Sequence, residues 1–106
     1  MTESNLPISE QFRIVARQWV DAEAAASLLE DTKSAVLSQR MAALGDMPVN
    51  RAEATVKASP EWHAYIENMI AARKQANKLK VQLEYLRMRS SEWTSEEATR
   101  RAEMKL

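Results

Sequence analysis

The sequence predicts an all-α protein: an antiparallel helical hairpin or coiled coil with a short connecting helix, which forms a dimer. The 106-residue chain contains one Gly and three Pro and is rich in Ala, Glu, Leu, Lys and Arg, the usage typical of long helices. Apolar residues recur at alternating steps of three and four in both halves, which keeps one narrow face of a helix toward a partner helix. We expect one helical domain over residues 1–106.

The first helix is predicted over residues 9–44. Ser9 suits the N-cap, Glu10 places a carboxylate in the first turn, and Gly45 suits a left-handed C-cap. The residues at three-four steps form the N-terminal seam: Ile8, Phe12, Val15, Trp19, Ala22, Ala26, Leu29, Lys33, Val36, Arg40 and Ala43.

A turn and a short helix are predicted over residues 45–58. Residues 45–48, Gly-Asp-Met-Pro, are the one concentrated turn signal in the chain. Asn50 and Glu53 form a capping-box pattern for a short helix that ends at Ala58. The chain is therefore expected to reverse its direction here. The alternative is a domain-swapped dimer in which residues 45–50 straighten and the helices continue, because the same seams serve both arrangements.

A long helix is predicted over residues 60–93, because Ser59 can cap a helix and Pro60 suits its first position. The residues at three-four steps form the C-terminal seam, which is apolar except at Ser90: Trp62, Tyr65, Met69, Ala72, Ala76, Leu79, Leu83, Leu86, Ser90 and Trp93. From the two seams we assign seven residues to the core or the dimer interface: Trp19, Leu29, Trp62, Met69, Leu79, Leu83 and Leu86.

The sequence leaves the end of the long helix open. Ser90 and Ser91 weaken it, and Thr94 with Glu97 forms a capping-box pattern that suits a separate terminal helix over residues 95–105. Continuation of the long helix through Ser91 is the other possibility.

Antiparallel pairing makes the two seams compatible. It sets Ala22 and Ala26 opposite residues 69–73. Arg73 and Lys80 take flanking positions beside the seam, which in a coiled coil normally carry charges for pairing. The long helix also has a second apolar set outside its seam: Ile66, Ile70, Val81 and Met88. Two helices do not enclose a core alone, so this surplus predicts a homodimer. A different protein that covers the same face is the alternative.

Composition argues against an enzyme or a metal site. The chain has no Cys and one His, and its one Gly excludes a Gly-rich phosphate loop, so we expect no catalytic residues, cofactor or metal. Residues 1–6 resemble no export signal, and no run of eighteen apolar residues occurs. We expect a cytoplasmic protein without a membrane segment.

Charge is unevenly distributed although the net charge is zero. Residues 1–36 carry six acidic and three basic side chains, and residues 71–106 carry five acidic and nine basic ones. We predict a partner-binding surface toward the C-terminal end, formed by Arg87, Arg89, Trp93, Arg100 and Arg101. Its partner is a protein, or alternatively nucleic acid bound through the arginines.

Several stretches resemble short helical accessory proteins that tailed phages and prophages encode near DNA-recombination genes. They are residues 59–62 (SPEW), 65–67 (YIE), 84–89 (EYLRMR), 92–93 (EW) and 97–106 (EATRRAEMKL). The resemblance implies an accessory factor of DNA metabolism, or an inhibitor of a host nuclease or defence complex. A third reading, independent of it, is a structural coiled-coil spacer.

Overall fold

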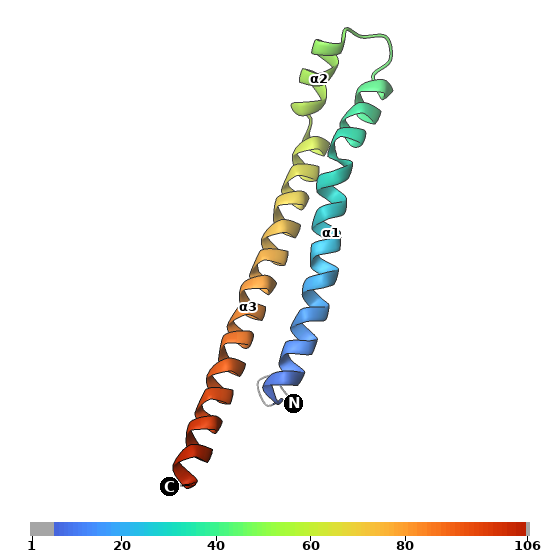
Figure 1. Cartoon of the computed structure of the whole chain (residues 1–106). Coiled ribbons are helices and arrows are strands. Elements are labelled where there is room, and N and C mark those ends of the chain that lie inside the picture. Colours follow the sequence, from blue (N-terminus) through green and yellow to red (C-terminus); the bar gives the residue numbers. More distant parts are fainter. Residues whose placement is uncertain (1–5, 106) are drawn as a thin grey trace. The chain divides into compact units, whose positions relative to one another are not determined.

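The protein is described here by a computed structural model, which covers residues 6–105 (Figure 1). Three helices and no strand occur in this range: α1 (Ile8–Ala43), α2 (Val49–Lys57) and α3 (Pro60–Met104). The all-α prediction is therefore confirmed, whereas the hairpin, the coiled coil and the dimer stay predictions. Residues 1–5 of the segment tested for an export signal, and Leu106 of the phage-like ending, lie outside the described residues.

The chain divides into two compact units. The terminal unit comprises Met1–Asp21 and Asn77–Leu106, and the bend unit comprises Ala22–Ala76. Each unit contains a part of α1 and a part of α3. The single domain over residues 1–106 stays a prediction.

α1 begins at Ile8, one residue before the predicted start. The carbonyl of Pro7 accepts hydrogen bonds from the backbone N–H groups of Glu10 and Gln11, both at 3.0 Å, so Pro7 takes the N-cap position. The prediction of Ser9 as the cap is wrong, because Ser9 already lies inside the helix. Glu10 does lie in the first turn, as predicted.

α1 ends at Ala43, and Gly45 follows with a φ of 84°. The N–H of Gly45 donates to the carbonyl of Ala42 at 3.1 Å and so satisfies one of the free carbonyls of the helix end. A Cβ at Gly45 would meet no atom within 4 Å, so the left-handed backbone, rather than space, favours glycine. The predicted C-cap is confirmed.

α2 begins without the predicted capping box. Pro48 is its N-cap and makes no side-chain cap, and the Pro48 carbonyl accepts the N–H of Ala52 at 2.9 Å. Asn50 lies within the helix, too late to cap it. Glu53 forms an ion pair with Lys57 at 2.7 Å instead of reaching back to the helix start.

Ser59 joins α2 to α3. Its Oγ accepts the backbone N–H of Trp62 at 3.2 Å, which is the predicted N-cap, and donates to the carbonyl of Val56 at 2.6 Å. The Ser59 hydroxyl therefore forms a hydrogen bond with a backbone carbonyl at the end of α2 and another with a backbone N–H at the start of α3.

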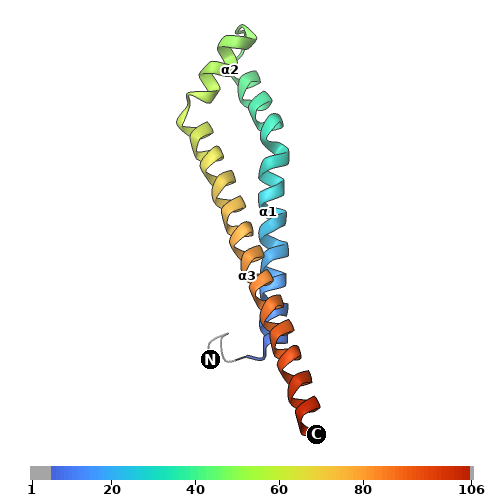
Figure 2. The same ribbon diagram turned by 60° about the vertical axis from the view of Figure 1, so that its left-hand side comes forward.

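α3 does not end at Trp93. It continues to Met104, so residues 95–104 belong to its last turns rather than to a separate helix (Figure 2). The hydroxyl of Thr94 donates to the carbonyl of Ser90 at 2.9 Å, and that of Thr99 to Ser95 at 3.0 Å. Thr94 bonds within the helix instead of capping a new one, which explains why the capping-box pattern misleads.

In the terminal unit, the first turns of α1 pack along α3. Val15, Leu79, Leu83 and Leu86 are buried, and Trp19 is half-buried. Phe12 lies next to Arg87, whereas residues 7–9 lie next to Ser90 and Trp93, so the two helices run in opposite directions within this unit.

In the bend unit, five core residues are buried, and Leu29 and Met69 are half-buried. The buried five are Ala26, Ala52, Val56, Trp62 and Ala76. The Tyr65 hydroxyl donates to the carbonyl of Leu29 and lies 3.0 Å from the hydroxyl of Thr32. The Tyr65 ring stacks on Trp62, with 5.6 Å between the ring centroids.

Candidate partner-binding site

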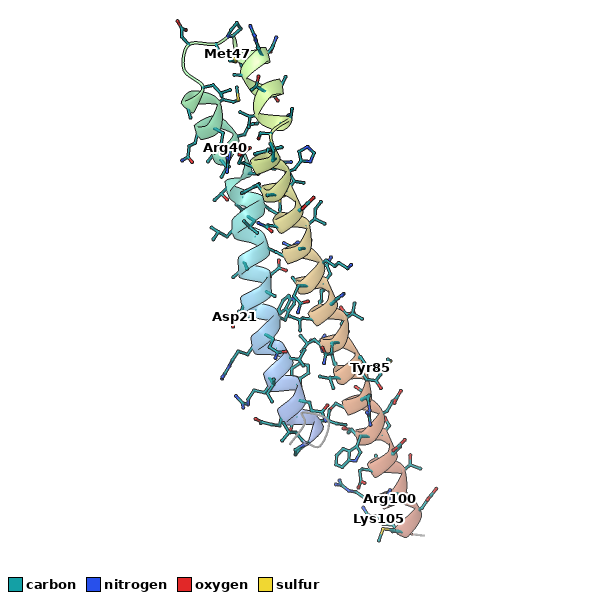
Figure 3. The ribbon with its side chains drawn as sticks, turned by 180° about the vertical axis from the view of Figure 1, so that it is seen from behind. Asp21, Arg40, Met47, Tyr85, Arg100 and Lys105 are labelled. Atoms are coloured by element: carbon teal, nitrogen blue, oxygen red, sulfur yellow. The ribbon has the colours of Figure 1, made fainter. Side chains whose placement is uncertain are left out.

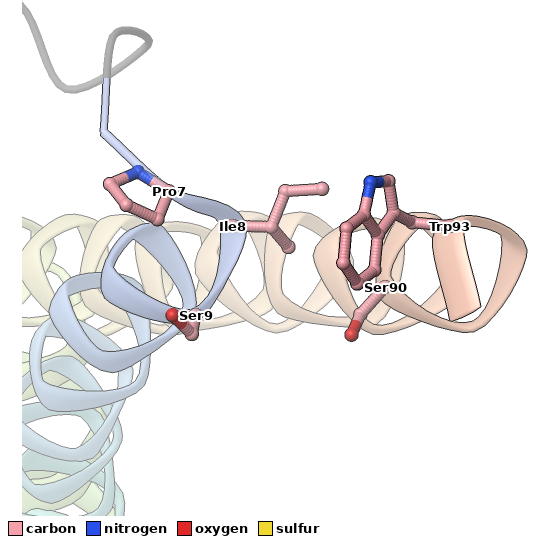
Figure 4. A pocket seen from close by; sticks show the side chains of 5 residues that line it. All are labelled: Pro7, Ile8, Ser9, Ser90 and Trp93. Carbon is pink, nitrogen blue, oxygen red and sulfur yellow. The ribbon is translucent and has the colours of Figure 1, made fainter. Parts of the chain in front are cut away.

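A hollow of about 350 Å³ lies in the terminal unit, where α1 starts beside α3 (Figure 4). It is lined by Pro7, Ile8, Ser9, Ser90 and Trp93. Ser90 explains the space, because it is a small polar residue at a seam position between Leu86 and Trp93. The hollow can therefore accept an apolar side chain from another molecule.

A second hollow of about 340 Å³ adjoins the first and shares Ile8, Ser9 and Ser90 with it. Phe12 and Arg87 also line it. The Arg87 guanidinium carbon lies 6.0 Å from the centre of the Phe12 ring, a cation–π contact. Arg87 is thus engaged within its own unit.

Trp93 is the accessible tryptophan of the chain. It is 59% exposed, whereas Trp62 is 6% exposed and Trp19 is half-buried. Figure 4 shows the Ile8 side chain directed toward the Trp93 ring, with Ser90 beneath. An exposed indole beside an apolar hollow is the arrangement that partner proteins commonly contact.

Helix periodicity puts three of the five residues predicted to bind a partner on one face of α3. Arg89, Trp93 and Arg100 follow at steps of four and seven along one continuous helix, which puts them on one face. Arg87 and Arg101 follow at a step of fourteen and share a different face, and Arg87 lines the adjoining hollow. Arg100 also forms an ion pair with Glu97 at 3.2 Å, whereas no ion pair within residues 6–105 involves Arg89 or Arg101.

The last turns of α3 extend past the first residue of α1 in the terminal unit (Figures 1 and 3). We call residues 94–105 the C-terminal arm. All of its residues are exposed except Glu97, which is half-buried. Arg100 and Lys105 are labelled on this arm in Figure 3.

Arg73 forms a separate charged cluster in the bend unit, with Glu23 and Glu30 of α1. Its Nη1 lies 2.6 Å from Glu23, and its Nε and Nη2 lie 2.9 and 2.7 Å from the two oxygens of Glu30. Hydrogen bonding to Arg73 lowers the pKa of Glu30 below its ordinary value of 4.5. The cluster ties α1 to α3 and confirms the charge pairing predicted for Arg73. Lys80, for which the spacing predicts the same role, takes part in no ion pair within residues 6–105.

Within residues 6–105, no group of three or more His, Cys, Asp or Glu side chains is placed to hold a metal ion. None of the helices there combines the length and the hydropathy needed to cross a membrane.

Comparison of the chain with family models, curated proteins and solved structures yields no match. The candidate site therefore rests on its own geometry.

Proposed function

We propose that the protein is a non-enzymatic helical interaction protein of the cytoplasm: an antiparallel hairpin that dimerises and binds another protein through its terminal unit. The observation that carries this proposal is the exposed Trp93 beside the 350 Å³ hollow. Tryptophan is enriched among the residues that dominate protein–protein affinity, and such residues fill or flank apolar hollows. The C-terminal arm extends this surface with charged residues.

A protein partner has more support than nucleic acid. Phosphate binding needs several free cations on one surface, and affinity grows with the number of phosphates neutralised. Arg87 contacts Phe12 and Arg100 pairs with Glu97, so two of the four candidate arginines are already engaged. The other two, Arg89 and Arg101, lie on different faces of α3.

The resemblance to short helical phage proteins directs the search for the partner. It supports an accessory factor that modulates or inhibits a nucleic-acid-processing or host-defence protein. The structural coiled-coil spacer predicts instead that replacing Arg87, Arg100 and Arg101 leaves every biological activity unchanged.

The test is quantitative affinity capture with the wild type and two variants, followed by binding of the purified candidate. Trp93→Ala removes the exposed indole, and we expect it to weaken binding of the partner by tenfold or more. Leu28→Ala is the control, because Leu28 is also exposed but lies in the bend unit. A partner that binds Trp93→Ala as tightly as the wild type would contradict the proposed site.

Binding of nucleic acid is tested by mixing the protein with single- or double-stranded DNA and measuring the molar mass by light scattering, at low and at near-physiological salt. We expect no complex, or one that forms only at low salt. A complex that survives near-physiological salt and is lost in Arg89→Ala/Arg101→Ala would favour the DNA-binding alternative.

A further inference from the structure

α3 carries a second regular stripe in the terminal unit, on the side away from its buried seam. We call it the outer face; its residues follow at steps of three and four: Lys78, Val81, Tyr85, Met88 and Glu92. The three apolar members are each more than half exposed. Figure 3 shows Tyr85 on the side of α3 that faces away from α1. Strict heptad spacing on an exposed face is typical of a helix that packs against another helix.

Charge on the outer face is arranged symmetrically about Tyr85. Lys78 precedes Tyr85 by seven residues, and Glu92 follows it by seven. Within residues 6–105 neither Lys78 nor Glu92 takes part in an ion pair. The stripe therefore has a basic end, an apolar middle and an acidic end, with both charges available.

We infer that the outer face binds the outer face of a second copy of this chain in antiparallel orientation, with the two-fold axis beside Tyr85. Antiparallel packing sets Lys78 of each copy opposite Glu92 of the other, which makes two ion pairs. Parallel packing would set lysine against lysine and glutamate against glutamate. Val81 and Met88 lie at unequal distances from the axis, so they would interdigitate around the two tyrosines. This inference rests on the dimer of the proposed function and names its interface.

The contact area of this interface is small, so the dimer is expected to have a low affinity. From Lys78 to Glu92 the helix face is about 21 Å long, and one helix side is on the order of 10 Å wide. Each copy would bury a few hundred Å², well under the roughly 800 Å² per partner of a standard stable interface. We therefore expect a weak, reversible dimer that salt weakens further.

Charge reversal tests the pairing by sedimentation equilibrium over a range of protein concentrations. In the antiparallel dimer, Lys78→Glu and Glu92→Lys each turn two attractive pairs into repulsive ones, and each should raise the dimer Kd by roughly tenfold. The double variant Lys78→Glu/Glu92→Lys restores the pairs and should return the Kd to the wild-type value. Both substituted positions are exposed, so circular dichroism should show unchanged helicity in all three variants.

Disulfide trapping tests the orientation separately, since the chain has no native Cys. A mixture of Lys78→Cys and Glu92→Cys chains should form a mixed disulfide under mild oxidation, because antiparallel packing brings these positions within bonding reach. Each variant alone should not crosslink. Crosslinking of each variant with itself would show parallel packing and overturn the inference.

The outcomes also separate this inference from the dimer on which it rests. If the wild-type chain stays monomeric at all accessible concentrations, both the proposed dimer and the outer-face interface are contradicted. The other outcome is a dimer whose Kd does not change in the charge-reversal variants and which forms no mixed disulfide. That result would support a dimer but show that the outer face is not its interface.

Discussion

Leu83 shows what one core side chain contributes. It is 8% exposed and lies in the narrow core of the terminal unit, where few neighbours can move to fill a cavity. We expect Leu83→Ala to lower the free energy of unfolding by about 2–5 kcal/mol, measured by urea denaturation at low protein concentration. The matched control is Leu28→Ala, the same chemical change at a 64% exposed position, which should cost less than about 0.5 kcal/mol. Equal losses in the two variants would show that the terminal unit has no such core.

Arg73 links two glutamates of α1 through three hydrogen bonds. Because all three side chains remain partly exposed, solvent screens their attraction. We expect Arg73→Met to lower Tm, by less than Leu83→Ala does, and the loss to shrink in high salt. Lys80→Met is the control, since Lys80 is exposed and has no ion pair within residues 6–105. A Tm that responds equally to both variants would argue against the cluster.

Residue types and spacing predicted charge pairing for Arg73 and Lys80 alike, and within residues 6–105 only Arg73 of the two forms ion pairs. They did not identify Glu23 and Glu30 as partners, because that choice depends on the rotation of α1 about its own axis. The hollow beside Trp93 was not predicted either. It arises only when the short side chain of Ser90 meets the start of α1 in three dimensions.

At the scale of the element, Ser59 holds the junction of α2 and α3. It accepts the N–H of Trp62 and donates to the carbonyl of Val56. We expect Ser59→Ala to cost about 1 kcal/mol of unfolding free energy in urea denaturation, because the start of α3 loses its cap. Ser38→Ala, an exposed change inside α1, should be neutral or slightly stabilising. A neutral Ser59→Ala would mean that water replaces the cap at no cost.

Three helices could be predicted from the sequence, and their ends only in part. Gly45 and Ser59 were identified correctly, because a left-handed turn and a Ser-Pro start each have one strong interpretation. Ser9, Asn50 and Thr94 matched capping patterns that the backbone does not use. Pro7 and Pro48 take the N-cap positions ahead of the first two, and Thr94 bonds back into its own helix. Such competition between neighbouring residues is not visible in spacing alone.

At the scale of the whole molecule, the ion pairs make stability depend on pH. Hydrogen bonds from Arg73 and Arg13 lower the pKa values of Glu30 and Glu10 below 4.5. A lowered pKa means that the folded chain binds the proton less readily than the unfolded chain, so this stabilisation is present above pH 4.5 and is lost as pH falls below it. We expect Tm to decline below that pH, and Glu30→Gln to flatten the decline. Asp31→Asn, a change at an exposed neighbour, should leave it unchanged.

The C-terminal arm has a consequence for the dynamics of the chain. Nearly every side chain in residues 94–105 is exposed. Only interactions within the helix itself, such as the Arg100–Glu97 ion pair, therefore keep the backbone of the arm helical. Amide protons there should exchange with deuterium faster than those near Leu83, whose opening requires loss of the core. A protein that binds along the arm would slow this exchange residue by residue. Deuterium exchange in the arm therefore shows whether a partner is bound there, even before that partner has been identified.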